Sequence, residues 1–180
     1  MGFLQLLRHL WLDDGDARRA LGAGALERLT ERVRDSERHH SGEICICVEA
    51  SLPLRYLWRH LRHREATARL SRERALERFG EQRVWDTEYN NGVLIYVLLA
   101  EHRIEIVADR GIVPHTDSAR WQDMLRDISA CLGSGRLEDG LAHAIDAVDR
   151  VLRQCFPSDG GPSQADGRDG GGLPDRPVIL

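Results

Sequence analysis

One stretch near the middle of the chain decides the fold, and it reads Asn91-Gly92-Val93-Leu94-Ile95-Tyr96-Val97-Leu98-Leu99-Ala100-Glu101-His102-Arg103-Ile104-Glu105-Ile106-Val107-Ala108. Residues 93–99 are an unbroken apolar run, which predicts a buried strand. The connection over 100–102 is too short for a crossover, so it predicts an antiparallel hairpin with a second strand over 103–108. Alternating charged and apolar residues indicate that this second strand is half-exposed near an edge of the sheet.

A further strand is predicted upstream, where residues 43–49 form a short apolar run bounded by Gly and Pro. Apolar residues at helical spacing predict one helix between Asp16 and His39 and a second from about residue 64 to 81. Because the second helix joins the strand at 43–49 to the hairpin, we expect those two strands to run parallel through a right-handed crossover.

Two more helices are predicted after the hairpin, over 117–132 and 137–156, each with an inward apolar face. The resulting order defines an α/β protein, a three-layer α/β/α sandwich with a small mixed sheet that combines a parallel crossover with an antiparallel hairpin. We expect the domain to span 15–157. An N-terminal amphipathic segment over 1–14 precedes it, and a disordered Gly/Pro-rich tail over 158–180 follows.

Composition limits the classes of function. The chain has 180 residues and a net charge of −4, which is typical of one ordinary globular domain. All 25 of its fixed positive charges are arginines, because the sequence has no lysine, so Schiff-base chemistry and a P-loop lysine are excluded. Residues 55–83 carry nine Arg against four acids, yet their Glu residues are placed to pair with the Arg side chains, so a solvated helix face is expected and nucleic-acid binding is not.

The two ends of the chain predict location and partners. No leader peptide, anchor or membrane span is recognisable, and the four cysteines are expected to be reduced thiols, so we expect a cytoplasmic protein. The apolar N-terminal segment is expected to dock on its own domain. It and the C-terminal tail, which ends in Pro177-Val178-Ile179-Leu180, are the places where a protein partner could bind. The sequence leaves the oligomeric state open.

Oxygen-bearing side chains are predicted to meet at one edge of the sheet. The strands at 43–49 and 93–99 start at the same edge if they run parallel, and the hairpin register places Asp109 opposite Gly92. A hard cation such as calcium or magnesium needs six to eight oxygen ligands of this kind. The predicted metal ligands are Asp86, Glu88, Asn90, Asp109 and Glu43.

A simpler interpretation of the same loop stays open. Asp86, Thr87 and the segment Asn90-Asn91-Gly92 are also typical of a helix cap followed by a turn into a strand, and that outcome is the commoner one. The loop lacks the full EF-hand pattern with its closing Glu. Cys45 and Cys47 are expected to be packed thiols rather than zinc ligands.

Catalytic motifs are missing from the sequence. It has no Gly-x-Ser-x-Gly elbow, no glycine-rich phosphate loop and no His-Glu-x-x-His motif, so nucleophilic hydrolysis, nucleotide binding and zinc proteolysis have no support. The pair His39-His40 could supply a general acid or base, although histidines at a helix end more often interact with its dipole and carbonyl groups. Whether the protein is an enzyme is left open.

Several segments, taken in their order along the chain, resemble the TPM-domain family. They are Ser36 to Ile44, Arg74 to Phe79, Asp86-Thr87, Asn91 to Val97, Ile106 to Ile112, Trp121 and Phe156-Pro157. The resemblance covers residues 15–157 and implies a compact α/β/α domain. Members of that family include lumenal proteins with acid phosphatase activity and bacterial proteins in which calcium lies by the loop before the central strand. The chain resembles the bacterial branch that has neither signal nor membrane anchor.

Two departures from the family pattern affect the implied site. Where many members have Asp-Asn-Gly before the strand, this chain has Asn90-Asn91-Gly92, and the lost carboxylate weakens a calcium site. Where members commonly have a Gly-Tyr-Gly-like element, this chain has Ala108-Asp109-Arg110-Gly111. The leading hypothesis is therefore a cytosolic interaction or divalent-cation-binding module. The alternative is a weak metal-assisted acid phosphatase in which an acid or His40 handles the proton.

Overall fold

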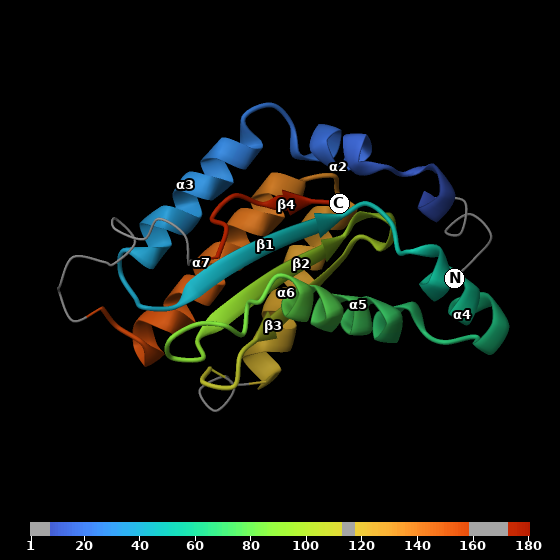
Figure 1. The fold of residues 1–180 in the computed structure, drawn as a ribbon. Coiled ribbons are helices and arrows are strands. Elements are labelled where there is room, and N and C mark those ends of the chain that lie inside the picture. Colours follow the sequence, from blue (N-terminus) through green and yellow to red (C-terminus); the bar gives the residue numbers. More distant parts are fainter. Residues whose placement is uncertain (1–7, 113–117, 159–172) are drawn as a thin grey trace.

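The computed structural model describes residues 8–112, 118–158 and 173–180 (Figure 1). Its helices are α2 (Asp14–Leu21), α3 (Ala25–Glu37), α4 (Leu54–His63), α5 (Thr67–Glu81), α6 (Ser118–Gly133) and α7 (Leu137–Cys155), and residues 8–11 are also helical. Its strands are β1 (Glu43–Glu49), β2 (Gly92–Leu98), β3 (Arg103–Ala108) and β4 (Val178–Ile179), and a short 3-10 helix, η1 (Leu99–Glu101), joins β2 to β3.

The sheet has the strand order β3-β2-β1-β4 and is mixed, as predicted. β1 and β2 run parallel with Glu43 opposite Gly92, and β2 and β3 form the antiparallel hairpin with Val93 opposite Ala108. The parallel crossover and the hairpin predicted from the central stretch are both confirmed. They bring the first residue of β1, the first residue of β2 and the last residue of β3 to one edge.

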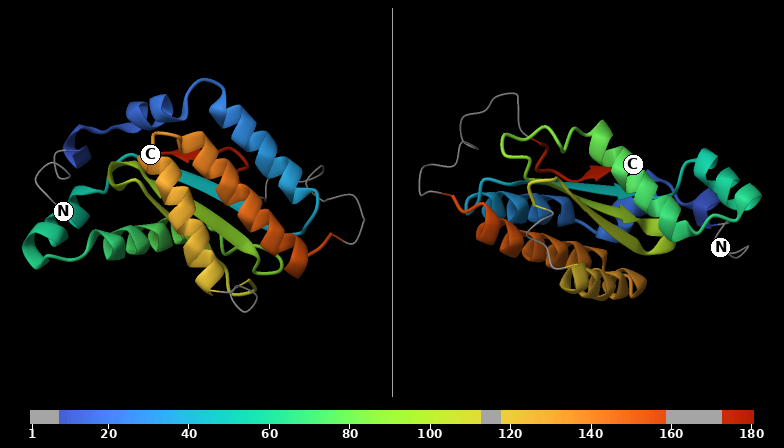
Figure 2. Two further views of the ribbon diagram at one scale, coloured as in Figure 1. Left: turned by 180° about the vertical axis from the view of Figure 1, so that it is seen from behind. Right: turned by 90° about the horizontal axis from the view of Figure 1, so that it is seen from below.

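Helices cover both faces of the sheet, which confirms the three-layer sandwich (Figure 2). On one face α2, α3, α6 and α7 pack over the even-numbered residues of β1, such as Ile44 and Ile46. On the other face α4 and α5 enclose a second core with Cys45 and Cys47. The strict alternation explains why β1 is apolar throughout, because each of its faces is buried.

Two helical segments differ from the predicted ones. The helix expected between Asp16 and His39 is two helices, since Gly22 and Gly24 adopt positive φ angles of 85° and 71° and end α2 before α3 begins. Helix α4 was not predicted. Its basic residues conceal the apolar spacing that makes it amphipathic, and Arg64, at φ 52°, ends it before α5.

The end of the chain differs from the disordered tail expected over 158–180. Val178 and Ile179 form β4, which pairs in parallel with Cys47 and Val48 of β1. The Leu180 N–H donates to the Val48 carbonyl at 2.9 Å. The apolar side chains of this short segment are half-buried because they lie beside the free edge of β1. Composition alone cannot predict such a pairing. Residues 159–172, the rest of the expected tail, lie outside the described part of the chain.

Candidate metal site at the edge of the sheet

The loop over residues 84–91 folds closely over the start of β2. A Cβ atom on Gly92 would lie 1.9 Å from the Val84 carbonyl oxygen, and one on Gly111 would lie 2.9 Å from the Tyr89 carbonyl oxygen. Glycine is therefore required at both positions by the approach of backbone atoms. The Val84 and Tyr89 carbonyl groups therefore pack directly against the two glycines that flank the hairpin end.

Asp109 lies beneath this loop at the predicted edge. Its backbone N–H donates to the Gly92 carbonyl at 2.9 Å, which confirms the predicted register. The residue is only 8% exposed. Its Oδ1 atom accepts a hydrogen bond from the Arg110 backbone N–H at 2.7 Å. Its Oδ2 atom is buried and has no hydrogen-bond partner among the described residues. A buried carboxylate oxygen without a donor is energetically unfavourable unless a cation, a water molecule or a proton satisfies it.

Asn90 is held by a cation on the neighbouring turn. Its Oδ1 atom accepts hydrogen bonds from Nε and Nη2 of Arg110 at 3.0 and 2.8 Å. Its backbone adopts a positive φ of 52°, which asparagine tolerates better than most residues. The guanidinium group of Arg110 therefore binds the Asn90 oxygen that was predicted to be a metal ligand.

The other three predicted ligands do not converge with Asp109 in a carboxylate cluster. Glu43 Oε2 accepts a hydrogen bond from the Leu173 backbone N–H at 3.0 Å, at the opposite margin of β1. Asp86 and Glu88 are exposed on the loop. Across residues 8–112, 118–158 and 173–180, no three His, Cys, Asp or Glu side chains are arranged to hold a metal ion. Of the five predicted ligands, Asp109 is the one whose free oxygen is buried at the edge.

Asn91 is a polar residue whose role the sequence did not specify. It is 1% exposed, and its Nδ2 atom donates to Ser41 Oγ, in the segment before β1, at 3.2 Å. Its backbone N–H donates to Thr87 Oγ1 at 3.0 Å, which is the turn that the simpler interpretation predicted. Its Oδ1 atom has no partner within the described ranges. The loop therefore forms a capped turn, and the turn and an ion site are compatible with each other.

His40 is a buried structural residue at the contact of α3 with α7. Its Nε2 atom lies 2.9 Å from Ser36 Oγ, and the same hydroxyl donates to Asp149 Oδ1 at 2.7 Å. Burial lowers the pKa of His40 to about 4, with partial compensation from the Asp149 charge. The imidazole is therefore neutral at physiological pH. The serine hydroxyl is directed to the acid, so these three side chains are not arranged as a nucleophile with its base.

Glu37 is a second titratable group with an unusual environment. Burial raises the pKa of its carboxyl group to about 8, and the charges of Asp175 and Glu43 add to that rise. The Ile44 backbone N–H donates to Glu37 Oε1 at 2.8 Å. This carboxyl group is therefore largely protonated at neutral pH. It also accepts the Ile44 N–H of β1, at a position with which β4 does not pair.

The two strand cysteines are packed thiols, as expected. Burial raises the pKa of both Cys45 and Cys47 to about 12, so neither is a thiolate at physiological pH. Cys45 Sγ donates to Gln82 Oε1 at 3.1 Å. Both residues belong to the core between the sheet and α5.

A buried ionic cluster lies at the other end of β1, and the sequence analysis missed it. Glu49 accepts hydrogen bonds from Arg74 Nη2 at 2.6 Å, Arg78 Nη2 at 2.8 Å and the Tyr96 hydroxyl at 2.7 Å. Burial acts to raise the pKa of Glu49, but these donors outweigh it and hold that pKa below its usual value. The prediction of a solvated face is wrong for Arg74, whose side chain is 4% exposed. The signal in the sequence was Glu49, an acid placed where an apolar strand ends.

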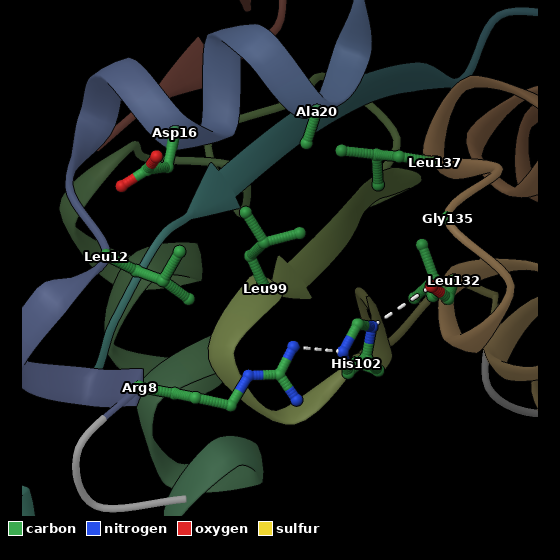
Figure 3. A pocket seen from close by; sticks show the side chains of 9 residues that line it. All are labelled: Arg8, Leu12, Asp16, Ala20, Leu99, His102, Leu132, Gly135 and Leu137. Carbon is green, nitrogen blue, oxygen red and sulfur yellow. Dashed lines mark hydrogen bonds between the residues drawn. The ribbon is translucent and has the colours of Figure 1, made fainter.

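A cavity of about 250 Å³ lies beyond the carboxyl end of β2, away from the acid edge (Figure 3). Its wall is mostly apolar, and Arg8 and His102 are hydrogen-bonded to each other along it. His102 Nδ1 lies 3.0 Å from the Leu132 carbonyl oxygen, to which it donates. The cavity residues are Arg8, Leu12, Asp16, Ala20, Leu99, His102, Leu132, Gly135 and Leu137. One arginine–histidine hydrogen bond in an apolar wall gives no arrangement for catalysis.

Comparison with known proteins places this fold in a family. The TPM domain model matches residues 16–151, so the chain belongs to the TPM domain family, as the resemblance implied. A solved structure with the same fold is the NMR structure of the BA42 protein from the psychrophilic bacterium Bizionia argentinensis. It superposes with a TM-score of 0.64 at 24% sequence identity, over 87% of this chain and 92% of that one. No curated protein matches the sequence.

Proposed function

We propose that this TPM-domain protein is a cytoplasmic, divalent-cation-binding module in which Asp109 is the anionic ligand. One observation supports the proposal above the others. Asp109 presents a buried carboxylate oxygen without a hydrogen-bond partner among the described residues, at the edge where carbonyl groups of the loop over 84–91 pack against Gly92 and Gly111. Calcium is coordinated by carboxylate and carbonyl oxygens together, and a site of this kind satisfies both.

The ligand set that fits this chain is narrower than the five residues expected from the sequence. Asp109 Oδ2 would supply the charge, and backbone carbonyls of the loop over 84–91 together with water would supply neutral oxygens. Asp86 and Glu88 are exposed on that loop and contribute long-range attraction for a cation. Arg110 lies against Asn90 and opposes that attraction. With one buried carboxylate, we expect weak binding, with a Kd of about 0.1–1 mM.

The phosphatase alternative is weakened because one of its two candidate proton-transfer groups does not suit that role. His40, which the sequence offered beside a carboxylate, is buried, neutral and hydrogen-bonded to Ser36. The hydroxyl of Ser36 in turn donates to Asp149. A role in binding is therefore better supported than a role in catalysis. The buried, unreactive thiols of Cys45 and Cys47 are in keeping with a reducing compartment.

Isothermal titration with calcium and magnesium chloride tests the proposal. The wild-type protein should release or absorb heat on addition of at least one of the two cations, and Asp109→Asn should abolish that heat. Asp139→Asn removes an exposed carboxylate on α7 and should bind as the wild type does. Equal heats for the wild type and Asp109→Asn would reject the assignment. Hydrolysis of an aryl phosphate that depends on Asp109 would replace it with the phosphatase alternative.

A further inference from the structure

Helix α4 carries an exposed apolar stripe that nothing in the described part of the chain covers. Leu54, Trp58 and Leu61 are 73%, 58% and 59% exposed. Their spacing places them on one side of the helix. A different side of the helix carries Tyr56 and Leu57, which are buried in the second core. The helix is therefore anchored by one face and displays a second apolar face to solvent, an arrangement that marks an interaction surface.

The stripe is flanked by positive charge. Residues 50–64 contain four arginines, two histidines and no acidic residue. Arg62 stacks over the Trp58 ring, with its guanidinium carbon 5.0 Å from the ring centroid. Arg59 pairs with Glu65 and Glu73, and Arg55 pairs with Glu77, so part of the charge is compensated, whereas Arg62 stays on the exposed side. A surface that complements this face must be both apolar and anionic.

The N-terminal helical turn adds apolar surface at the same end of the molecule. His9 is buried, and its carbonyl oxygen accepts a hydrogen bond from Ser51 Oγ at 2.7 Å, close to the start of α4. Its neighbours Leu10 and Trp11 are 59% and 82% exposed. Figures 1 and 2 show this turn and α4 projecting together beyond the carboxyl end of β1. The two elements therefore present exposed tryptophan and leucine side chains at one pole of the domain.

We infer that this pole docks on an anionic lipid surface, with α4 lying flat in the headgroup region. A basic amphipathic helix with Trp and Leu on its apolar side is the form that binds an interface without crossing it. Tryptophan favours the headgroup level, and arginine stems extend toward phosphate groups. The apolar face belongs to a projecting convex helix, which a lipid surface accommodates and a protein partner would have to enclose in a groove. No described helix is long and apolar enough to cross a membrane.

Co-sedimentation with lipid vesicles tests this inference. We expect the wild-type protein to pellet with vesicles of phosphatidylcholine and phosphatidylglycerol at low salt, and to remain in solution with phosphatidylcholine alone. Trp58→Ser should reduce binding by about tenfold or more because the anchoring ring is lost. Trp85→Ser is the matched control, since Trp85 is 51% exposed before β2, at the opposite end of the strands. It should bind as the wild type does.

A second pair of variants tests the charge. Arg62→Gln should weaken binding to the anionic vesicles, whereas Arg150→Gln on the exposed side of α7 should not. Thermal melts of all variants should match the wild type, because every substituted side chain is exposed or lies on a helix surface. Full binding by Trp58→Ser, or no binding by the wild type, would overturn the inference. A dimer in sedimentation velocity without lipid that Trp58→Ser dissociates would also overturn it, in favour of a second copy of the chain.

Discussion

The backbone N–H of Asp109 donates to the carbonyl oxygen of Gly92 at 2.9 Å, one position beyond the last residue of β3. This bond continues the hairpin into the polar edge and fixes the acid beneath the loop over 84–91. One oxygen of its carboxylate is buried and has no hydrogen-bond partner in the described part of the chain. The hairpin register thus places the buried carboxylate on which the proposed function depends.

Gly92 should not tolerate a side chain. A Cβ atom there would lie 1.9 Å from the Val84 carbonyl oxygen, so Gly92→Ala must displace the loop from the sheet. We expect a loss of at least about 3 kcal/mol in the free energy of unfolding, measured by urea denaturation. Gly80→Ala is the control, because a Cβ atom on that α5 residue meets nothing within 4 Å. It should stabilise the protein by about 0.5–1 kcal/mol. A Gly92→Ala protein as stable as the wild type would show that the loop does not pack as described.

Arg74 should be essential for stability although it is a charged residue. It donates to the buried carboxylate of Glu49, and Arg74→Met would leave that acid with fewer donors in the core. We expect a cost of about 3–5 kcal/mol in chemical denaturation, since an uncompensated charge stays buried. Arg69→Met on the same helix removes an exposed pair with Glu73 and should change stability by about 0.5 kcal/mol or less. Equal effects of the two substitutions would contradict the buried cluster.

Stability should fall as pH rises through the neutral range, because of Glu37. Its folded-state pKa of about 8 lies above the ordinary value of 4.5, so the folded protein binds a proton that the unfolded chain has released. The contribution of Glu37 is complete at low pH and disappears as pH rises toward 8. His40 acts in the opposite sense, but below pH 6.5, because its pKa is lowered to about 4.

The window between pH 6.5 and 8 therefore excludes His40, and comparison with Glu37→Gln assigns the remaining pH dependence to Glu37. Chemical denaturation there should show stability decreasing by up to about 1.4 kcal/mol per pH unit. Glu37→Gln keeps an acceptor for the Ile44 N–H and should remove this decrease. A wild-type stability that stays flat or rises across the window would mean that Glu37 is ionised in the folded protein.

The last residues should protect the edge of β1. The Ala50 N–H donates to the Leu180 carbonyl at 2.8 Å, and the Leu180 N–H donates to Val48. Leu180→Pro removes the second donor, so β4 should loosen and the Ala50 amide should exchange faster with solvent. The Ile95 amide, in the centre of β2, is the internal control and should keep its protection. An unchanged exchange rate at Ala50 would show that β4 does not hold this edge.

The sheet could be predicted from the sequence because its signals are local. A short connection after the apolar run over 93–99 requires a hairpin, and a helix between β1 and β2 requires a parallel crossover. The break between α2 and α3 was missed because the apolar spacing continues across the two glycines. Helix α4 was missed because its charges conceal its periodicity, and β4 because a four-residue apolar end gains stability only from a partner strand.

The position of Asp109 could be predicted from the sequence, but the partners of the other candidate ligands could not. Register alone brings Asp109 to the edge of β2, and that placement is observed. Spacing could not show that Arg110 would occupy the Asn90 oxygen, or that Glu43 would bind the backbone of a segment 130 residues later. The Glu49 cluster was hidden for the same reason. Which arginines of an Arg/Glu-rich helix are buried depends on the rotation of that helix against the sheet.

Titration of isotope-labelled protein with calcium chloride, followed by amide nitrogen–proton NMR spectra, tests the central claim most directly. Binding at Asp109 predicts progressive, saturable shifts of the Asp109, Arg110 and Gly111 amides and of the amides over 84–91. The amide of His102, at the distant cavity, should not move. The same titration of Asp109→Asn should leave all of these signals in place. Shifts that persist in Asp109→Asn, or a wild-type spectrum that calcium does not change, would contradict the claim that this edge is a cation site.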